Sequence, residues 1–221
     1  MKDNILMNLY VEGYVGAALE IYLFVLISSK IKNIYQINFD NNISYYWLCF
    51  TVLTGMWEIF YILNYNNVIR MSKDLIINKQ HVWTNKYNLG IVLPWNLSYV
   101  FYSEYGAYAD REYMTNKDKW SRIIEGTHSS LCGLFSLMTI YFFHNKLVNK
   151  YYICLGISMG SQLMNSILYC GQYLIQTKNK NSINYNTSNF PCGKYLDKRP
   201  FMWINIFWFL MPSYILLMHL V

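Results

Sequence analysis

The chain has 221 residues, of which 54% are hydrophobic and only 14% are charged, and its formal net charge is +6. The apolar residues are gathered into long blocks, which excludes an ordinary soluble domain and is typical of an integral membrane protein. The basic residues lie mostly between the blocks and form no basic face, so nucleic-acid binding is not expected. We expect a single membrane domain over residues 1–221.

The first apolar block runs from Tyr14 to Ser29 and carries one carboxylate, Glu20. No basic segment with a cleavage motif precedes it, so we expect a retained span. A carboxylate in hydrocarbon is costly unless it is paired or faces water. Because Glu20 lies near one end of the block, the sequence favours a shallow position with the side chain reaching the interface, and an intramembrane role is the alternative.

The second block, Tyr45 to Leu63, carries Glu58 at its middle, where a side chain cannot easily reach the interface. A functional or packed interior role is therefore favoured for Glu58. Thr54 precedes it by four residues and shares its helical face. The polar segment that follows, residues 64–88, is expected to be a connection.

The third block, Leu89 to Ala109, is apolar but is interrupted by Pro94 and is rich in Tyr and Trp. Aromatic, interrupted segments suit the membrane interface or a re-entrant cap better than a continuous span. We therefore expect an interfacial aromatic segment here.

The fourth block, Trp120 to Phe143, is long enough to cross a bilayer and contains Glu125 and His128. These two residues are three positions apart, so a helix places them on one face. Ionisable side chains within a membrane span indicate a functional site by default.

The fifth block, Tyr151 to Ile175, carries Gln162, Asn165 and Tyr169, whose spacing places them on one helical face. Such a polar stripe either bonds helices together or lines a cavity, and the pattern leaves both open.

The last block, Phe201 to Val221, carries Asn205, Trp208 and Pro212 on one face. Pro212 frees a backbone carbonyl and allows a local kink. The sequence thus predicts an all-α membrane bundle of about five transmembrane helices with one interfacial aromatic segment.

The cysteines are odd in number and scattered, with no CxxC motif. In apolar blocks a free cysteine behaves as a small hydrophobic residue, so neither a disulfide framework nor a metal site is expected. The five are Cys49, Cys132, Cys154, Cys170 and Cys192.

Three blocks supply polar faces that a bundle can bring into one pocket, with Glu58, Glu125, and Asn205 beside Trp208. Two acids and an indole in a dry pocket suit chemistry on a lipophilic substrate that passes through a cation. One carboxyl group, kept protonated by burial, donates a proton, and the other stabilises positive charge together with the indole. The same pocket would bind protonated lipophilic amines.

Several motifs, in order, resemble the emopamil-binding protein family. EGTHSSLCGLFSL from Glu125 is similar to the start of the family's third span, and NIFWFLMP from Asn205 is similar to its N-x-x-W-x-x-x-P. SEYGAYADREY from Ser103 resembles its E-Y…D-x-R-Y stretch, and Glu58 with the following IFYILNY resembles its second span. Gln162 and the Leu168–Tyr169 pair fit the fourth. The resemblance extends from about Tyr45 to Pro212.

The resemblance implies the EXPERA fold, shared with the sigma-two receptor, over about residues 45–221. It implies a sterol isomerase of the endoplasmic reticulum membrane that moves the ring double bond from position 8 to position 7 through a carbocation at C8. The reaction is redox-neutral, so no cofactor is expected. A sterol substrate, lipophilic amines as inhibitors, the lipid bilayer and a homodimer are the implied partners.

Residue by residue, the resemblance gives two sets. The acid–base and polar set is Glu58, Glu125 and Asn205, to which we add His128. Trp208 would stabilise the cation, and Tyr105 and Tyr113 would close the pocket. The substrate-binding set is Thr54, Tyr105, Tyr113, Gln162, Tyr169 and Trp208.

One position departs from the family, which has histidine where this chain has Thr54. Threonine cannot shuttle a proton near neutral pH as imidazole can. This chain instead has His128 where the family has threonine. Two interpretations stay open: the imidazole has moved to the neighbouring helix and serves the same pocket, or His128 is a packed polar residue and catalysis is lost.

Two other functions compete with the isomerase. The first is a non-catalytic binder of sterols and lipophilic amines, like the sigma-two branch of the same fold, which Thr54 favours. The second is a subunit of a larger membrane complex, which outward-pointing Glu58 and Glu125 side chains would favour.

Overall fold

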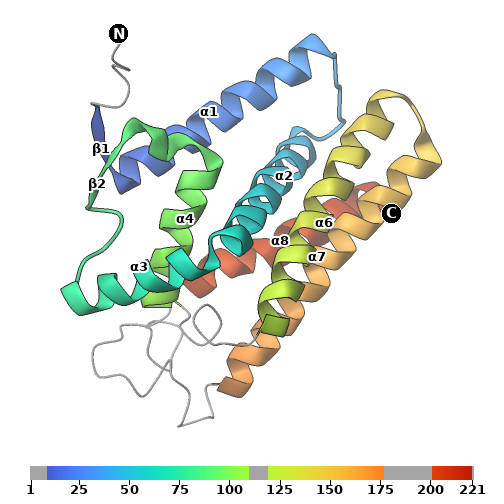
Figure 1. The fold of residues 1–221 in the computed structure, drawn as a ribbon. Helices are drawn as coiled ribbons and strands as arrows, with labels where there is room; N and C mark the ends of the chain where they lie inside the picture. The colour runs from blue at the N-terminus through green and yellow to red at the C-terminus, as the bar shows by residue number, and fades with distance from the viewer. Residues whose placement is uncertain (1–8, 110–118, 177–200, 221) are drawn as a thin grey trace.

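The computed structural model describes residues 9–109, 119–176 and 201–220 (Figure 1). These residues are almost entirely helical, which confirms the predicted all-α class. Two short strands, β1 (Tyr10–Glu12) and β2 (Lys86–Asn88), pair antiparallel. The helices are α1 (Gly13–Ile34), α2 (Asn42–Leu63), α3 (Tyr65–Asn78), α4 (Pro94–Glu104), α6 (Lys119–His144), α7 (Val148–Gln176) and α8 (Phe201–Leu220).

Three of the described helices are long and apolar enough to cross a bilayer. They are α1, α2 and the Val148–Gly171 part of α7, and α8 contains a shorter apolar stretch, Ile204–His219. Their outward faces carry exposed apolar side chains such as Ile27 and Ile153, which are 56% and 62% exposed. The chain therefore has the membrane character that its composition predicts.

The helices α2, α6, α7 and α8 pack in succession, with α6 and α7 side by side and antiparallel (Figure 1). The α2–α6 contact is close because glycines face each other. A Cβ atom at Gly55 would lie 2.8 Å from the Ser129 backbone oxygen, and one at Gly133 would lie 3.3 Å from that of Thr51. Small residues let membrane helices approach in this way.

The segment expected to be a connection, residues 64–88, contains the helix α3. Its buried residues Tyr65, Val68, Ser72 and Leu75 are spaced three and four apart, which gives one face that packs against α4. Polar residues occupy the other face of α3 and mask this helical period in the sequence.

The aromatic segment is interrupted at Pro94, as expected, because a 3₁₀ turn at Leu89–Val92 ends before it and α4 starts at it. Pro94 lies in the first turn of α4, where the missing N–H is not needed. A single π-helical turn, Tyr105–Ala109, continues the chain after α4. Leu97 and Val100 of α4 are 2% and 3% exposed, so this segment packs into the fold.

The start of α1 is held by the loop before β2. The backbone N–H of Gly13 donates to the Asn85 carbonyl at 3.0 Å, and that of Tyr14 donates to the Trp83 carbonyl at 3.1 Å. A Cβ atom at Gly13 would collide with the carbonyl oxygen of Val82, so glycine is required at this close approach. The first orphan N–H groups of α1 are thereby satisfied.

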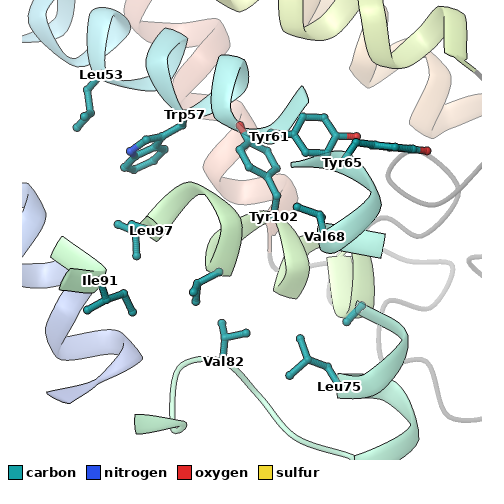
Figure 2. Close-up of a cluster of buried hydrophobic side chains, with 12 residues drawn as sticks. Leu53, Trp57, Tyr61, Tyr65, Val68, Leu75, Val82, Ile91, Leu97 and Tyr102 are labelled. Atoms are coloured by element: carbon teal, nitrogen blue, oxygen red, sulfur yellow. The ribbon is translucent and has the colours of Figure 1, made fainter. Parts of the chain in front are cut away.

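Two clusters of buried hydrophobic side chains fill the fold. The first joins α2, α3 and α4 and contains Trp57, Tyr61 and Tyr102 (Figure 2). The second joins the 37–39 loop, α2, α7 and α8, and includes Tyr45 and Ile215. The α2 helix contributes to both clusters and so connects the two halves of the molecule.

We expect Gly55→Ala to destabilise the protein. The new Cβ atom would meet a backbone oxygen, so α2 and α6 must separate, at a cost of about 1–3 kcal/mol. Melting in detergent micelles checks this. Gly156→Ala in α7 is the matched control, since its added Cβ meets no atom of another element within 4 Å among residues 9–109, 119–176 and 201–220. Equal melting temperatures for the two variants would contradict the packing described.

Candidate polar and aromatic site in the helical bundle

Glu58 is half-buried and contacts α4. Its Oε1 accepts a hydrogen bond from the hydroxyl of Tyr102, which is 8% exposed. The Tyr61 ring stacks on the Tyr102 ring with centroids 4.7 Å apart (Figure 2). Burial, and then the Glu58 carboxylate, raise the pKa of Tyr102 well above its usual value, so the hydroxyl stays protonated and donates.

Glu20, unlike the half-buried Glu58, is fully buried, so the expectation that it reaches the interface was wrong. The residue is 3% exposed, and its Oε1 accepts a hydrogen bond of 3.1 Å from Trp57 Nε1. Gly13 and Gly16 lie seven and four positions before Glu20 and are buried on the same helix. This spacing of small and polar residues marks the packed face of α1 and could have identified Glu20 from the sequence.

An aromatic path runs from Trp57 toward α7. The Phe101 ring lies 5.7 Å from Trp57 and 6.3 Å from Tyr105, centroid to centroid. The hydroxyls of Tyr105 and Tyr169 are hydrogen-bonded at 2.7 Å. Two residues predicted to bind substrate are thus brought together, although they are 64 positions apart in the chain.

Gln162 joins α7 to α2 through both ends of its amide. Its Oε1 accepts from Trp47 Nε1 at 3.1 Å, and its Nε2 donates to Thr51 Oγ1 at 2.8 Å. Trp208 of α8 packs on the same tryptophan, at 5.0 Å, and stacks on Phe50 at 5.8 Å. The polar stripe was expected either to join helices or to line a cavity, and the bonds of Gln162 join helices. Trp47, Phe50 and Trp208 form an aromatic layer next to it.

His128 faces α7. Its Nε2 lies 3.0 Å from the Ser161 carbonyl oxygen and 3.4 Å from Cys132 Sγ. A carbonyl oxygen only accepts, so Nε2 carries a proton and donates it to Ser161. Nδ1 is buried and has no hydrogen-bond partner within the described part of the chain. The face of α6 that meets α2 is formed instead by Gly126 and Gly133.

The remaining predicted residues are placed as follows. Thr54 Oγ1 donates to the Thr51 carbonyl at 3.2 Å, so its hydroxyl serves its own helix. Asn205 is half-buried in α8. Glu125 lies in α6, with its side chain outside the described residues, and Tyr113 lies outside them as well.

A cavity of about 400 Å³ lies between α1, α2 and α8. Phe24 of α1, Trp47 and Phe50 of α2 and Met211 of α8 are among the residues that line it. The aromatic layer around Trp208 therefore forms one side of a space that can hold an apolar group.

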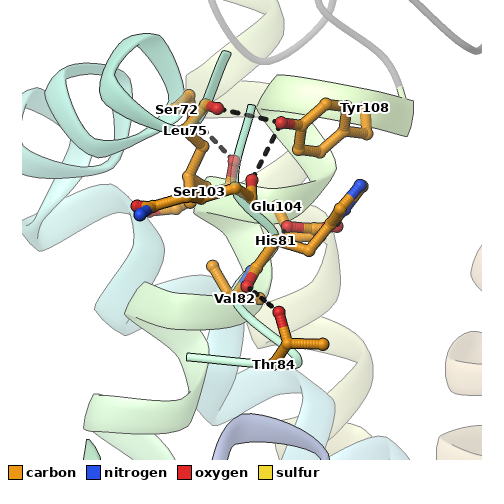
Figure 3. A network of polar contacts seen from close by, with 9 residues as sticks. Ser72, Leu75, His81, Val82, Thr84, Ser103, Glu104 and Tyr108 are labelled. Atoms are coloured by element: carbon orange, nitrogen blue, oxygen red, sulfur yellow. Dashed lines mark hydrogen bonds and ion pairs between the residues drawn. The ribbon is translucent and has the colours of Figure 1, made fainter. Parts of the chain in front are cut away.

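A polar network joins the end of α4 to α3 and to the loop that follows α3 (Figure 3). Glu104 Oε1 lies 2.6 Å from His81 Nδ1, and its Oε2 accepts from the Val82 N–H at 3.0 Å. The Tyr108 hydroxyl donates to the carbonyl oxygens of Leu75 and Gln80 at 2.9 and 2.8 Å. Since the 81–85 loop also caps α1, Glu104 fixes the position of α1 from a distance.

No group of three or more His, Cys, Asp or Glu side chains comes together as a metal site within residues 9–109, 119–176 and 201–220. Four of the five cysteines are free thiols, namely Cys49, Cys132, Cys154 and Cys170. Cys192 lies outside the described residues.

Comparison with protein-family models, with curated proteins and with solved structures gives no match to this chain. The fold and site define a helical membrane protein with buried carboxylates in an aromatic setting. The family resemblance rests on the motifs quoted above.

We expect Glu104→Gln to loosen the loop that caps α1. The amide keeps one acceptor oxygen and replaces the other with an NH2 donor, so it can no longer accept from the Val82 N–H and from a protonated His81 Nδ1 together. Hydrogen exchange of the Val82 and Gly13 amides should speed up about tenfold, as for the loss of one hydrogen bond. Asp74→Asn, on an exposed position of α3, is the control. Unchanged protection at Val82 would contradict this role of Glu104.

Proposed function

We propose that the protein is a membrane enzyme that moves a sterol ring double bond from position 8 to position 7, with Glu58 in the acid–base role. The observation that carries this proposal is the Glu58–Tyr102 pair, a carboxyl group held inside the fold by a buried phenol. We also propose that the protein crosses the membrane five times and resides in the endoplasmic reticulum. It invokes no cofactor because the reaction is redox-neutral.

The chemistry needs one proton in and one proton out. Protonation of the 8,9 double bond at C9 leaves a cation at C8, and loss of the C7 proton forms the new double bond. A carboxyl group in a dry site can donate the first proton, and a carboxylate can accept the second. Tyr102, which stays protonated, keeps the Glu58 carboxyl group in position for either step.

Aromatic rings supply the second requirement, stabilisation of the cation. Trp208 lies in the layer with Trp47 and Phe50, and an indole face attracts positive charge. The Tyr105–Tyr169 pair lies at the end of the aromatic path that runs from Trp57 through Phe101. Lipophilic amines would inhibit because their ammonium group resembles the C8 cation in charge.

Residues from the resemblance complete the proposed site. Glu125, Asn205 and Tyr113 join Glu58 in it. In support, α6 approaches α2 beside Glu125, where a Cβ atom at Gly126 would collide with Ile62. Because Glu58 bonds to Tyr102 of its own chain, a subunit that pairs this acid with another chain is disfavoured.

We expect Glu58→Gln to abolish the conversion of Δ8 to Δ7 sterols in cells that lack their own sterol isomerase. An amide cannot transfer the proton, so the rate should fall about 10²–10⁴-fold. Sterol extraction and mass spectrometry give the readout. Asp74→Asn is the control for expression. Absence of Δ7 sterols with well-expressed wild-type protein would reject the isomerase.

A sterol binder without turnover is the second candidate function. Two observations favour it: the Thr54 hydroxyl is bonded to its own helix, and the contacts of His128 lead to α7. Neither group is then a proton shuttle beside Glu58. In this case the wild-type protein would bind sterols and lipophilic amines and leave the double bond in place.

We expect His128→Ala to lower stability by about 1 kcal/mol, because the bond to Ser161 is lost, and to leave the conversion per folded molecule unchanged. His128→Gln, which keeps an N–H donor, should restore the melting temperature. A large drop in conversion for both variants, without loss of stability, would instead show that the imidazole serves catalysis.

A further inference from the structure

The cavity between α1, α2 and α8 is open to the surface of the helices. Ile21 and Val25 of α1 line it and are 38% and 42% exposed. Phe24 and Phe50 lie deeper and are only partly exposed. Because α1 and α2 are long and apolar enough to cross a bilayer, a lipid can reach the cavity sideways from the membrane.

The inner end of the cavity is next to Glu20. The helices α1 and α2 run antiparallel here, so Phe24 lies beside Phe50 and Glu20 lies beside Trp57. Phe24 and Phe50, both in the cavity wall, form an edge-to-face pair with centroids 6.3 Å apart. Glu20 lies one helical turn before Phe24, and its partner Trp57 packs on Phe50 at 6.4 Å. The Phe24–Phe50 pair thus separates the carboxylate from the cavity.

Half of the Glu20 carboxyl group has no partner. Trp57 Nε1 donates to Oε1, but Oε2 is buried and has no hydrogen-bond partner among residues 9–109, 119–176 and 201–220. The residue as a whole is 3% exposed, so water does not compensate from outside. Such an oxygen is unfavourable to bury and gains most from a donor that a ligand brings.

We propose that this cavity binds the apolar body of a lipid alcohol, and that the lipid hydroxyl donates a hydrogen bond to Glu20 Oε2 when the Phe24 ring turns aside. A neutral hydroxyl crosses the hydrocarbon at less cost than an ammonium group, so an alcohol is the fitting donor. The site is separate from Glu58, which bonds to α4, and it stands whether or not the chain is an isomerase.

Photolabelling of the full chain in nanodiscs tests this proposal. The probe is a sterol alcohol that carries a diazirine, and the competitors are a sterol alcohol and its methyl ether, which has no hydroxyl donor. Labels should map to α1 and α2 around Phe24 and Phe50. The alcohol should compete at least about tenfold better than the ether, as for one hydrogen bond to a carboxylate. In Glu20→Leu, this advantage should disappear.

Variants of the wall keep the test decisive if Glu20→Leu does not fold. Val25→Trp fills the cavity and should cut labelling at least about tenfold, as for a lost apolar contact surface. Ile27→Trp, which lies outside the cavity wall on the exposed face of α1, is the matched control and should label as wild type. A diazirine-bearing acyclic alcohol shows whether the site selects rings; labelling by either probe supports the proposal.

Three outcomes would overturn it. They are equal competition by alcohol and ether on the wild-type protein, labelling that Val25→Trp leaves unchanged, and labelling that is lost in Glu58→Gln. The last would place the alcohol in the Glu58 site. Retained labelling in Glu58→Gln without sterol conversion by the wild type would reject the isomerase and keep the lipid-alcohol site.

Discussion

The cost of placing a carboxyl group inside an apolar helical bundle shapes the centre of this structure. Two successive residues of α2 take part in the hydrogen bonds that offset this cost, one toward α1 and the other toward α4. Trp57 donates to Glu20 of α1, and Glu58 accepts from Tyr102 of α4. In both pairs the donor belongs to a large aromatic side chain, which supplies a hydrogen bond and also excludes water. One turn of α2 therefore fixes how α1 and α4 pack against it.

The rest of the fold keeps this turn in register. On the side of α6, Gly55 and Gly133 allow a close approach that no larger side chain permits. On the side of α7 and α8, the Gln162 amide and the Trp208 ring contact the first half of α2, at Thr51 and Phe50. The aromatic layer of Trp47, Phe50 and Trp208 borders the apolar cavity, and this layer is the feature that suits a rigid apolar ligand.

Much of this organisation follows from sequence patterns. Block lengths predicted α1, α2, α6, α7 and α8 to within a few residues, because a long apolar run in a low-charge chain has few other solutions. Tyr105 and Tyr169, which the resemblance assigns to one set, are hydrogen-bonded to each other, and their role in binding a substrate stays a prediction. Local patterns did not reveal α3, because polar residues on one face hide its helical period.

The site was harder to predict because partners are set by tertiary packing. Position along the block suggested a shallow Glu20, yet the side chain points inward, since Gly13 and Gly16 turn that face of α1 toward Val82 and Ile91. In the same way, spacing placed His128 on the face of Glu125 but could not show which neighbouring helix that face meets. Helical periodicity identifies a face and leaves its neighbour undetermined.

The anchoring of α1 links the polar network at Glu104 to the helix that carries Glu20. Helix α1 begins at Gly13, which is fixed by the 81–85 loop, and that loop is fixed in turn by Glu104 at the end of α4. Glu20 lies two turns further along the same rigid helix. Glu104 and Glu20 therefore both act on the placement of α1, the first through the loop that holds Gly13 and the second through its bond to Trp57. Phe24 lies one turn beyond Glu20 on the same helix and lines the cavity, so the contacts that position α1 also position one wall of that cavity.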